Sequence, residues 1–412
     1  MYNKHQNQRT VKKQKEPIWL IILRLALAGL FLYSGFVKAV DPVASGIKMD
    51  EYFTSFGMGF MHPFSLWIGM LMNIAEFTLG FMLLFKIRVK LTSLGYLLFM
   101  LFFFFLTAWL AIAEHLEVNY GYNFGVVKDC GCFGQAIQMS NLETFLKNVV
   151  ILAGVLIIFG KRKTIYDIRL TILGQWILAF VGAGAVLLLQ VYCMRNLPII
   201  EFRNMKIDPN TLEKVNINWN KGNNVADIFV EKPAEINVLF LYANEKGEEK
   251  LLSMEEMENI TDSYPKFYEE FNYVDRVDSV IAEAVKSVVP GFFMLDEQGR
   301  DFAGIYLTKE LVYILFMHDL DEAPPKALQS ENLKSLIAHC NKNKIDLVAI
   351  TNTPPEGIDM FAKTHKLPFP IYYNPIDPVK GPFIVRDAIR SNPGLIVLKN
   401  GIIVEKKSWH NF

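Results

Sequence analysis

Residues 91–113 decide the fold class of this chain, because they read LTSLGYLLFMLFFFFLTAWLAIA without one charged side chain. At about 1.5 Å per residue, a helix of this length crosses the roughly 30 Å hydrocarbon core of a bilayer. Four other stretches are similarly apolar: 18–37, 64–85, 145–160 and 170–191. The sequence therefore predicts an α-helical membrane bundle of about five transmembrane helices, followed by a soluble α/β domain.

Lysine and arginine in the short flanking segments predict the orientation of this bundle, because cytoplasmic loops carry an excess of both. They gather before the first helix, between the second and third, and between the fourth and fifth: Lys4, Arg9, Lys12, Lys13, Lys15, Lys86, Arg88, Lys90, Lys161, Arg162, Lys163 and Arg169. With five helices, all three groups lie on one side. We therefore expect a protein of the bacterial inner membrane with a cytoplasmic N-terminus. Residues 114–144 and the chain after Met194 would be periplasmic.

The composition argues against several classes of function. The 42 basic and 42 acidic side chains give a net charge of +0, which offers no reason to expect nucleic acid as a partner. The sequence has no glycine-rich phosphate loop, nucleophile elbow or His-Glu-x-x-His zinc motif, so hydrolase and nucleotide-binding functions have no support. Membrane lipid is the first expected partner.

The strongest functional motif is DCGCFG at residues 129–134, in the loop between the third and fourth predicted helices. Cys130 and Cys132, two of only four cysteines, are separated by Gly131 alone. Residues two apart lie within the Cα separation that a disulfide bridges, and glycine lets the backbone bend. The ring would be very small, so strain would make the bond easy to reduce. The motif predicts a redox pair, with Lys128 favouring a thiolate and Asp129 opposing it.

No metal site is expected at this pair, because a tetrahedral centre needs more ligands and His115 is the only imidazole nearby. Cys193 lies at the outward end of the fifth predicted helix. Two interpretations stay open for it: a resolving thiol for the redox pair, or a small apolar residue in a packed helix end. Cys340 lies on the apolar face of a predicted helix and is assigned to the core.

Arg24 and Glu76 fall inside predicted transmembrane helices, where each would be costly alone. Arg24 and Glu76 lie at depths of roughly 9 and 14 Å from the cytoplasmic side, within reach of an arginine side chain. We predict that they form an intramembrane pair. A structural staple between the first two helices and a role in proton or quinone chemistry are both open. Lys38, at the outward end of the first helix, is expected to reach the headgroups and to be structural.

After Arg195 the pattern changes to short strand-like runs alternating with polar helices, which is typical of a soluble α/β domain. Residues 311–317, 346–351, 370–373 and 395–398 are predicted strands, and 326–342 and 355–365 are predicted helices. The predicted organisation is a cytoplasmic basic arm (1–17), a four-helix membrane domain (18–160), a fifth helix (161–194), a β-rich connecting region (195–288) and a second α/β unit (289–412).

This last unit resembles the thioredoxin-like domains of periplasmic thiol reductases and peroxiredoxins. The resemblance rests on residues 293–299, which read FMLDEQG, and on Pro393, which falls where that family keeps a cis-proline. The family's Cys-x-x-Cys follows the central strand, but residues 318–323 read HDLDEA here. The resemblance therefore implies a thioredoxin-like domain without dithiol chemistry of its own.

The membrane half resembles the DoxX/MauE superfamily over about residues 18–160. The motifs that carry it are Leu23-Arg24-Leu25, the FLYSGFVK run at 31–38, Glu76 with Gly80, and the loop at 129–134. The Cys-Gly-Cys-Phe-Gly form is that of the MauE-like branch, whose founding member is linked to disulfide maturation of a periplasmic amine dehydrogenase. The resemblance marks Cys130 and Cys132 as the redox pair, and Arg24 and Glu76 as the intramembrane polar pair.

Two hypotheses for function follow. The first is an inner-membrane thiol-disulfide redox protein, an oxidoreductase component whose Cys130 and Cys132 exchange electrons with an envelope protein, with a quinone in the bundle as the candidate cofactor. The second is a non-catalytic anchor or scaffold subunit of a larger envelope complex, whose thioredoxin-like domain serves as a docking surface. The sequence names neither the client protein nor the direction of electron flow.

Overall fold

The computed structural model describes residues 16–122, 124–125, 127, 130–134, 136–137, 139–200, 202, 219, 221–226, 235–282, 292–375 and 385–412. The predictions for the basic arm before residue 16, for Lys128 and Asp129, and for the start of the second α/β unit at 289–291 lie outside the described residues. The chain forms two compact units. One comprises Met1–Asn204 with Lys407–Phe412, and the other comprises Met205–Lys406.

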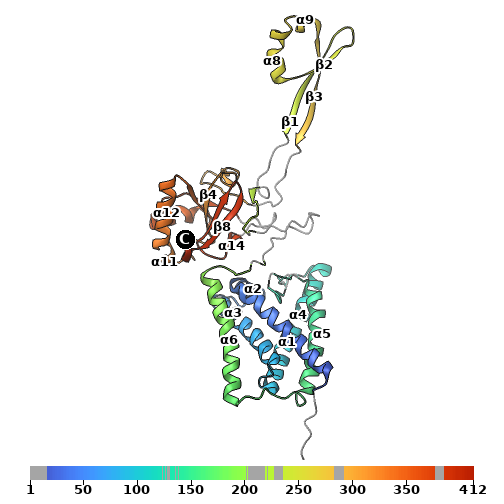
Figure 1. Ribbon diagram of the computed structural model, residues 1–412, viewed down its shortest axis with the longest axis vertical. Coiled ribbons are helices and arrows are strands. Elements are labelled where there is room, and N and C mark those ends of the chain that lie inside the picture. Colours follow the sequence, from blue (N-terminus) through green and yellow to red (C-terminus); the bar gives the residue numbers. More distant parts are fainter. Residues whose placement is uncertain are drawn as a thin grey trace, which may run out of the picture. The chain divides into compact units, whose positions relative to one another are not determined.

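The membrane unit is a helical bundle (Figure 1). Its helices are α1 (Ile18–Val40), α2 (Pro42–Ser55), the 3₁₀ helix η1 (Gly59–Phe64), α3 (Ser65–Leu84), α4 (Val89–Tyr120), α5 (Asn141–Lys161) and α6 (Ile172–Arg195). Five candidate membrane spans occur among the described residues: α1, η1 with α3, α4, α5 and α6. The prediction of five membrane helices is therefore confirmed.

Helix α2 was not predicted. It has 14 residues and begins at Pro42, with the Asp41 carboxylate accepting a hydrogen bond from Ala44 N at 3.1 Å. Aspartate at the N-cap and proline at the first position are typical helix-start signals. Its composition is only weakly apolar, so a search for long apolar stretches does not find it. The helix packs against α3 and contributes to the site described below.

Helices α1 and α3 pack antiparallel with their backbones in close approach. A Cβ atom on Gly35 would lie 2.7 Å from the Phe77 nitrogen, and one on Gly80 would lie 2.8 Å from the Leu32 nitrogen. Small residues permit such contacts between membrane helices. Gly35 is thus level with Phe77 and Leu32 with Gly80, which fixes the register of the two helices.

The remaining helices complete a common apolar core. It is formed by residues of α1, the end of α3, α4 and α5, including Leu27, Phe31, Tyr96, Met100 and Val155. Helix α6 joins the bundle through a buried polar contact in which Asn73 Nδ2 donates to Gln190 Oε1 at 3.1 Å. Gly182 of α6 also approaches the Phe81 ring closely.

The second unit contains an antiparallel three-stranded sheet in the order β2-β1-β3. Its strands are β1 (Glu235–Ala243), β2 (Glu249–Ser253) and β3 (Asn272–Ala282), and the helices α8 (Met254–Ser263) and α9 (Phe267–Glu270) lie between β2 and β3. Tyr242, Leu252, Phe267 and Phe271 form its buried cluster. All three strands lie within the stretch 195–288, for which the sequence predicts a β-rich connecting region.

The same unit holds a five-stranded sheet in the order β6-β5-β4-β7-β8. Its strands are β4 (Val312–Met317), β5 (Asp346–Thr351), β6 (Ile371–Tyr373), β7 (Gly394–Lys399) and β8 (Ile402–Ser408). β4, β5 and β6 run parallel, and β7 runs antiparallel to β4. Besides the short α10 (Ala303–Leu307), α11 (Pro325–Leu328) and α14 (Val385–Ala388), the larger helices α12 (Glu331–Asn343) and α13 (Pro355–His365) belong to this part.

The predicted helix at 326–342 is divided into α11 and α12. Ser330 stands between them and caps α12 by accepting a hydrogen bond from Leu333 N at 3.1 Å. The Asn392–Pro393 peptide bond, at the position that the sequence analysis singled out, is cis. The C-terminal region is thus a mixed α/β domain, and its assignment as thioredoxin-like stays a prediction.

Candidate functional site

The cysteine loop folds so that its two thiols meet. Cys130 and Cys132 are free cysteines, with their Sγ atoms 2.8 Å apart. The intervening Gly131 has φ +66°, a left-handed conformation that side chains disfavour. A Cβ there would also lie 3.0 Å from Lys48 Cγ. Glycine is therefore required at the turn that brings the sulfur atoms together.

Three helices hold this loop in place. Ser34 Oγ of α1 donates to the Cys132 carbonyl at 2.6 Å, and the Tyr52 hydroxyl of α2 donates to the Cys130 carbonyl at 3.2 Å. Asn141 Nδ2 at the start of α5 donates to the Val127 carbonyl at 3.1 Å. These three hydrogen bonds to backbone carbonyls of the loop fix the position of the cysteine pair against the bundle.

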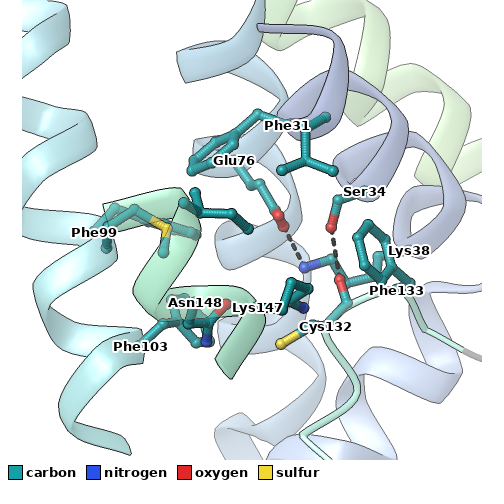
Figure 2. A pocket seen from close by; sticks show the side chains of 13 residues that line it. Phe31, Ser34, Lys38, Glu76, Phe99, Phe103, Cys132, Phe133, Lys147 and Asn148 are labelled. Atoms are coloured by element: carbon teal, nitrogen blue, oxygen red, sulfur yellow. Dashed lines mark hydrogen bonds and ion pairs between the residues drawn. The ribbon is translucent and has the colours of Figure 1, made fainter. Parts of the chain in front are cut away.

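The two cysteines have different surroundings. Cys130 is buried in a small cluster with Tyr52, Leu110 and Val127. Cys132 is half-buried and lines a pocket inside the bundle, as Figure 2 shows. Cys132 is therefore the more accessible thiol of the pair.

The pocket combines an apolar wall with a few charged groups. Its cavity volume is about 30 Å³, which is space for one or two water molecules. Its wall consists of residues from α1, α3, α4, α5 and the cysteine loop: Leu30, Phe31, Ser34, Lys38, Glu76, Phe99, Met100, Phe103, Cys132, Phe133, Lys147, Asn148 and Ile151.

Lys38 and Glu76 form a buried ion pair in this pocket (Figure 2). Lys147 of α5 reaches the same pocket, and its ammonium nitrogen lies 4.6 Å from the centroid of the Phe133 ring, a cation–π distance. A thiol, two amines and one carboxyl group therefore meet in a largely desolvated space, where electrostatic interactions are stronger than in water.

The predicted pair between Arg24 and Glu76 is wrong. Arg24 instead contacts Glu16 at 3.1 Å and donates to the carbonyl oxygens of Leu83 and Leu84 at 3.1 and 3.0 Å. These carbonyls belong to the last turn of α3, where helical partners are missing. The prediction assumed that the start of α1 and the end of α3 lie at the same depth in the membrane. In the structure, the first residues of α1 extend beyond the end of α3.

The register explains the exchange of partners. The Arg24 side chain reaches the carbonyl of Leu84, which lies eight residues, or about 12 Å, along α3 from Glu76. Lys38 is less than one turn beyond Gly35, and Gly35 is level with Phe77, the neighbour of Glu76. Glu76 therefore pairs with Lys38, which the sequence analysis had assigned to the headgroup region.

The local contacts make the two thiols chemically unequal. A hydrogen bond from the Cys130 thiol, assisted by the nearby Lys147 and Lys38 charges, lowers the pKa of Cys132 to about 7. Donating that hydrogen bond, together with burial, raises the pKa of Cys130 well above its ordinary value. Cys132 is the thiol that ionises first, and a thiolate is the attacking form of cysteine.

This asymmetry predicts the order of alkylation in the reduced protein. With its pKa at about 7, Cys132 is about half thiolate at pH 7, whereas burial and its hydrogen bond raise the pKa of Cys130 and keep it a thiol. The lower intrinsic nucleophilicity of a low-pKa thiolate offsets part of this difference. We expect limiting iodoacetamide to modify Cys132 about tenfold faster than Cys130, with a rate that falls about tenfold per pH unit below pH 6. Peptide mass spectrometry measures both rates. Faster reaction of Cys130 would contradict the assignment.

The other two cysteines lie apart from these features. Cys193 is buried on α6 and belongs neither to the Cys130 cluster nor to the residues that line the pocket. Its role as a resolving thiol stays a prediction. Cys340 is buried on α12, and burial raises the pKa of its thiol to about 11, which fits a core residue.

Lys147 was missed in the sequence, and Lys38 was assigned the wrong surroundings. Lys147 was not considered, although it is a charged residue inside the predicted fourth span, and such residues are functional candidates by default. Lys38 was considered but assigned a structural role. The rule that identified Arg24 and Glu76 would have found Lys147, whereas Lys38 could be placed only with the helix register.

The match with known proteins concerns this part of the chain. Residues 16–160 match the family model of methylamine utilisation protein MauE. This MauE-like segment extends from α1 to the end of α5, so it contains the cysteine loop and every residue of the pocket. Helix α6 and the second unit lie outside the match. The searches of curated proteins and of solved structures found no match for the chain.

Proposed function

We propose that this protein is a membrane thiol-disulfide redox protein in which Cys130 and Cys132 exchange electrons with an envelope protein. The observation that carries the proposal is the 2.8 Å approach of two free thiols beside a charged pocket in the MauE-like segment. The two thiols differ in ionisation and in burial. The more accessible one, Cys132, is suited to attack a client disulfide, and the buried one, Cys130, is suited to resolve the mixed disulfide that forms.

The exchange would proceed in two steps. The Cys132 thiolate attacks a disulfide of the client protein, which forms a mixed disulfide and releases one client thiol after protonation. Cys130 then attacks Cys132 Sγ, which releases the second client thiol and leaves the Cys130–Cys132 disulfide. Two electrons pass to the client with the proton of Cys130, and the second proton that the client thiols need comes from the surroundings; the reverse sequence oxidises a client dithiol.

A quinone is the proposed lipid-soluble partner of the pair. The support is the wall of Phe99, Met100 and Phe103 beside the Lys38–Glu76 ion pair, because an aromatic wall with a few convergent polar groups is typical of a cofactor site. The cavity of about 30 Å³ holds water but no quinone ring, so this proposal requires the wall side chains to move apart.

Orientation in the inner membrane is part of the proposal. Lysine and arginine flank the ends of the bundle opposite the cysteine loop, which supports a cytoplasmic N-terminus and a periplasmic cysteine loop. A periplasmic location gives the pair an oxidising compartment in which to cycle.

The test is the redox state of the pair in cells. Acid quenching followed by a maleimide that adds mass to free thiols separates the dithiol from the disulfide on a gel, with Cys193→Ser/Cys340→Ser protein as the background. We expect both states in growing cells, and a shift of the ratio when quinone reoxidation is blocked. A pair that stays in one state under every condition would contradict the redox function.

A scaffold role is the second candidate. Its support is the five-stranded mixed sheet and the lack of a cysteine at residues 318–323, directly after β4. These features favour a thioredoxin-like domain that retains a docking surface without redox chemistry. If the Cys130→Ser/Cys132→Ser protein still assembles with its partner and supports growth, the scaffold role is favoured instead.

A further inference from the structure

The charges around Cys132 balance only while it is a thiolate. Lys38 and Lys147 contribute two positive charges, and Glu76 contributes one negative charge. The Cys132 thiolate supplies the second negative charge, so the reduced site is neutral. Formation of a disulfide removes that charge and leaves an excess of one positive charge in a desolvated pocket.

Among the described residues of the other elements around the pocket, none supplies a replacement anion. Helix α4 contributes only Phe99, Met100 and Phe103 to its wall. On α2, the Tyr52 hydroxyl donates to the Cys130 carbonyl, and Lys48, which contacts Gly131, is ion-paired with Glu51. Within the part of the chain that the structure describes, the balance of charge therefore depends on Lys38, Lys147, Glu76 and the cysteines.

Of the two lysines, Lys147 depends on the thiolate. Lys38 is ion-paired with Glu76, a partner that formation of a disulfide does not remove. Among the described residues, no ion pair with a carboxylate includes Lys147. Its contacts are the Phe133 ring and the electrostatic attraction to Cys132 and Cys130. The Cys132 thiolate therefore balances the charge of Lys147, as the Glu76 carboxylate balances the charge of Lys38.

We infer that Lys147 releases its proton when Cys130 and Cys132 form a disulfide, so that the site delivers two electrons together with two protons. An uncompensated charge in a desolvated site is costly, and a group that can become neutral does so. One S–H bond and one N–H bond break and one S–S bond forms. The acceptor, a client disulfide or a quinone, takes both electrons and both protons. This inference rests on the proposed redox function.

The test is the pH dependence of the dithiol–disulfide equilibrium in the purified full-length protein in nanodiscs. Above the Cys132 pKa of about 7, Cys132 has already lost its proton, so the protons released on oxidation would come from Cys130 and Lys147. The equilibrium constant, corrected for the redox buffer, should change about 100-fold per pH unit for two protons and about tenfold for one. Dithiothreitol buffers between pH 8 and 9, with maleimide gel shifts, measure it.

Lys147→Arg is the decisive variant, because arginine keeps the positive charge but does not lose its proton. We expect a change of about 100-fold per pH unit in the wild type and about tenfold in Lys147→Arg. The Lys38→Arg control should retain the wild-type slope. Unchanged alkylation of Cys132 near pH 7 in Lys147→Arg would show that its site remains intact.

Two outcomes would overturn the inference: a one-proton slope in the wild type, or a two-proton slope that persists in Lys147→Arg. Failure of Cys130 and Cys132 to form a disulfide in any redox buffer is a different result, which would overturn the proposed function itself.

Discussion

Replacing Cys130 with serine is expected to trap the protein in a mixed disulfide with its client, from an undetectable amount to a major fraction of the chain. Cys132 keeps its place beside Lys38 and Lys147, so it still attacks, but the thiol that would resolve the adduct is gone. Cys132→Ser should form no adduct, because Cys130 is buried and its pKa is raised. Non-reducing gels of quenched cells measure the adduct, and mass spectrometry identifies the client.

Cys193 and Cys340 provide the controls for this trap. Cys340→Ser should change nothing, since Cys340 is a core residue of α12. If Cys193 is a resolving thiol, the adduct should accumulate more in Cys130→Ser/Cys193→Ser than in Cys130→Ser alone. Equal adduct from Cys130→Ser and Cys132→Ser would contradict the division of roles between the two cysteines.

Lys38→Met is expected to destabilise the membrane unit by about 3–5 kcal/mol, because it leaves the Glu76 carboxylate buried without its ion-pair partner. Denaturation by sodium dodecyl sulfate in mixed micelles, followed by circular dichroism, measures the free energy of unfolding. Lys38→Met/Glu76→Leu should recover much of the loss, because both charges are removed together.

The matched control is Lys48→Met. Lys48 pairs with Glu51, whose side chain is 46% exposed, and pairs open to solvent contribute about 0–1 kcal/mol. A loss in Lys38→Met no larger than in this control, or a double variant less stable than Lys38→Met, would contradict a buried ion pair at this position.

Local features were predictable from the sequence. The five membrane helices follow from uninterrupted apolar length, and β4, β5, β6 and β7 follow from short apolar runs bounded by turn residues. The α11–α12 division was missed because its cause is one serine cap inside a helical pattern. Helix α2 was missed for a related reason, because its sequence PVASGIKMDEYFTS has no long apolar run.

The sequence by itself determined that Cys130 and Cys132 lie in one tight turn. The two cysteines are separated only by Gly131, whose backbone can adopt the conformation of that turn. Only the tertiary structure decided which charges surround them. The partner of Glu76 depends on the register of α1 against α3. That register is set by close contacts of glycines with residues that are far from them in the sequence. Lys38, Glu76, Lys147 and Cys132 come from three helices and a loop, so their common pocket exists only when the bundle is packed.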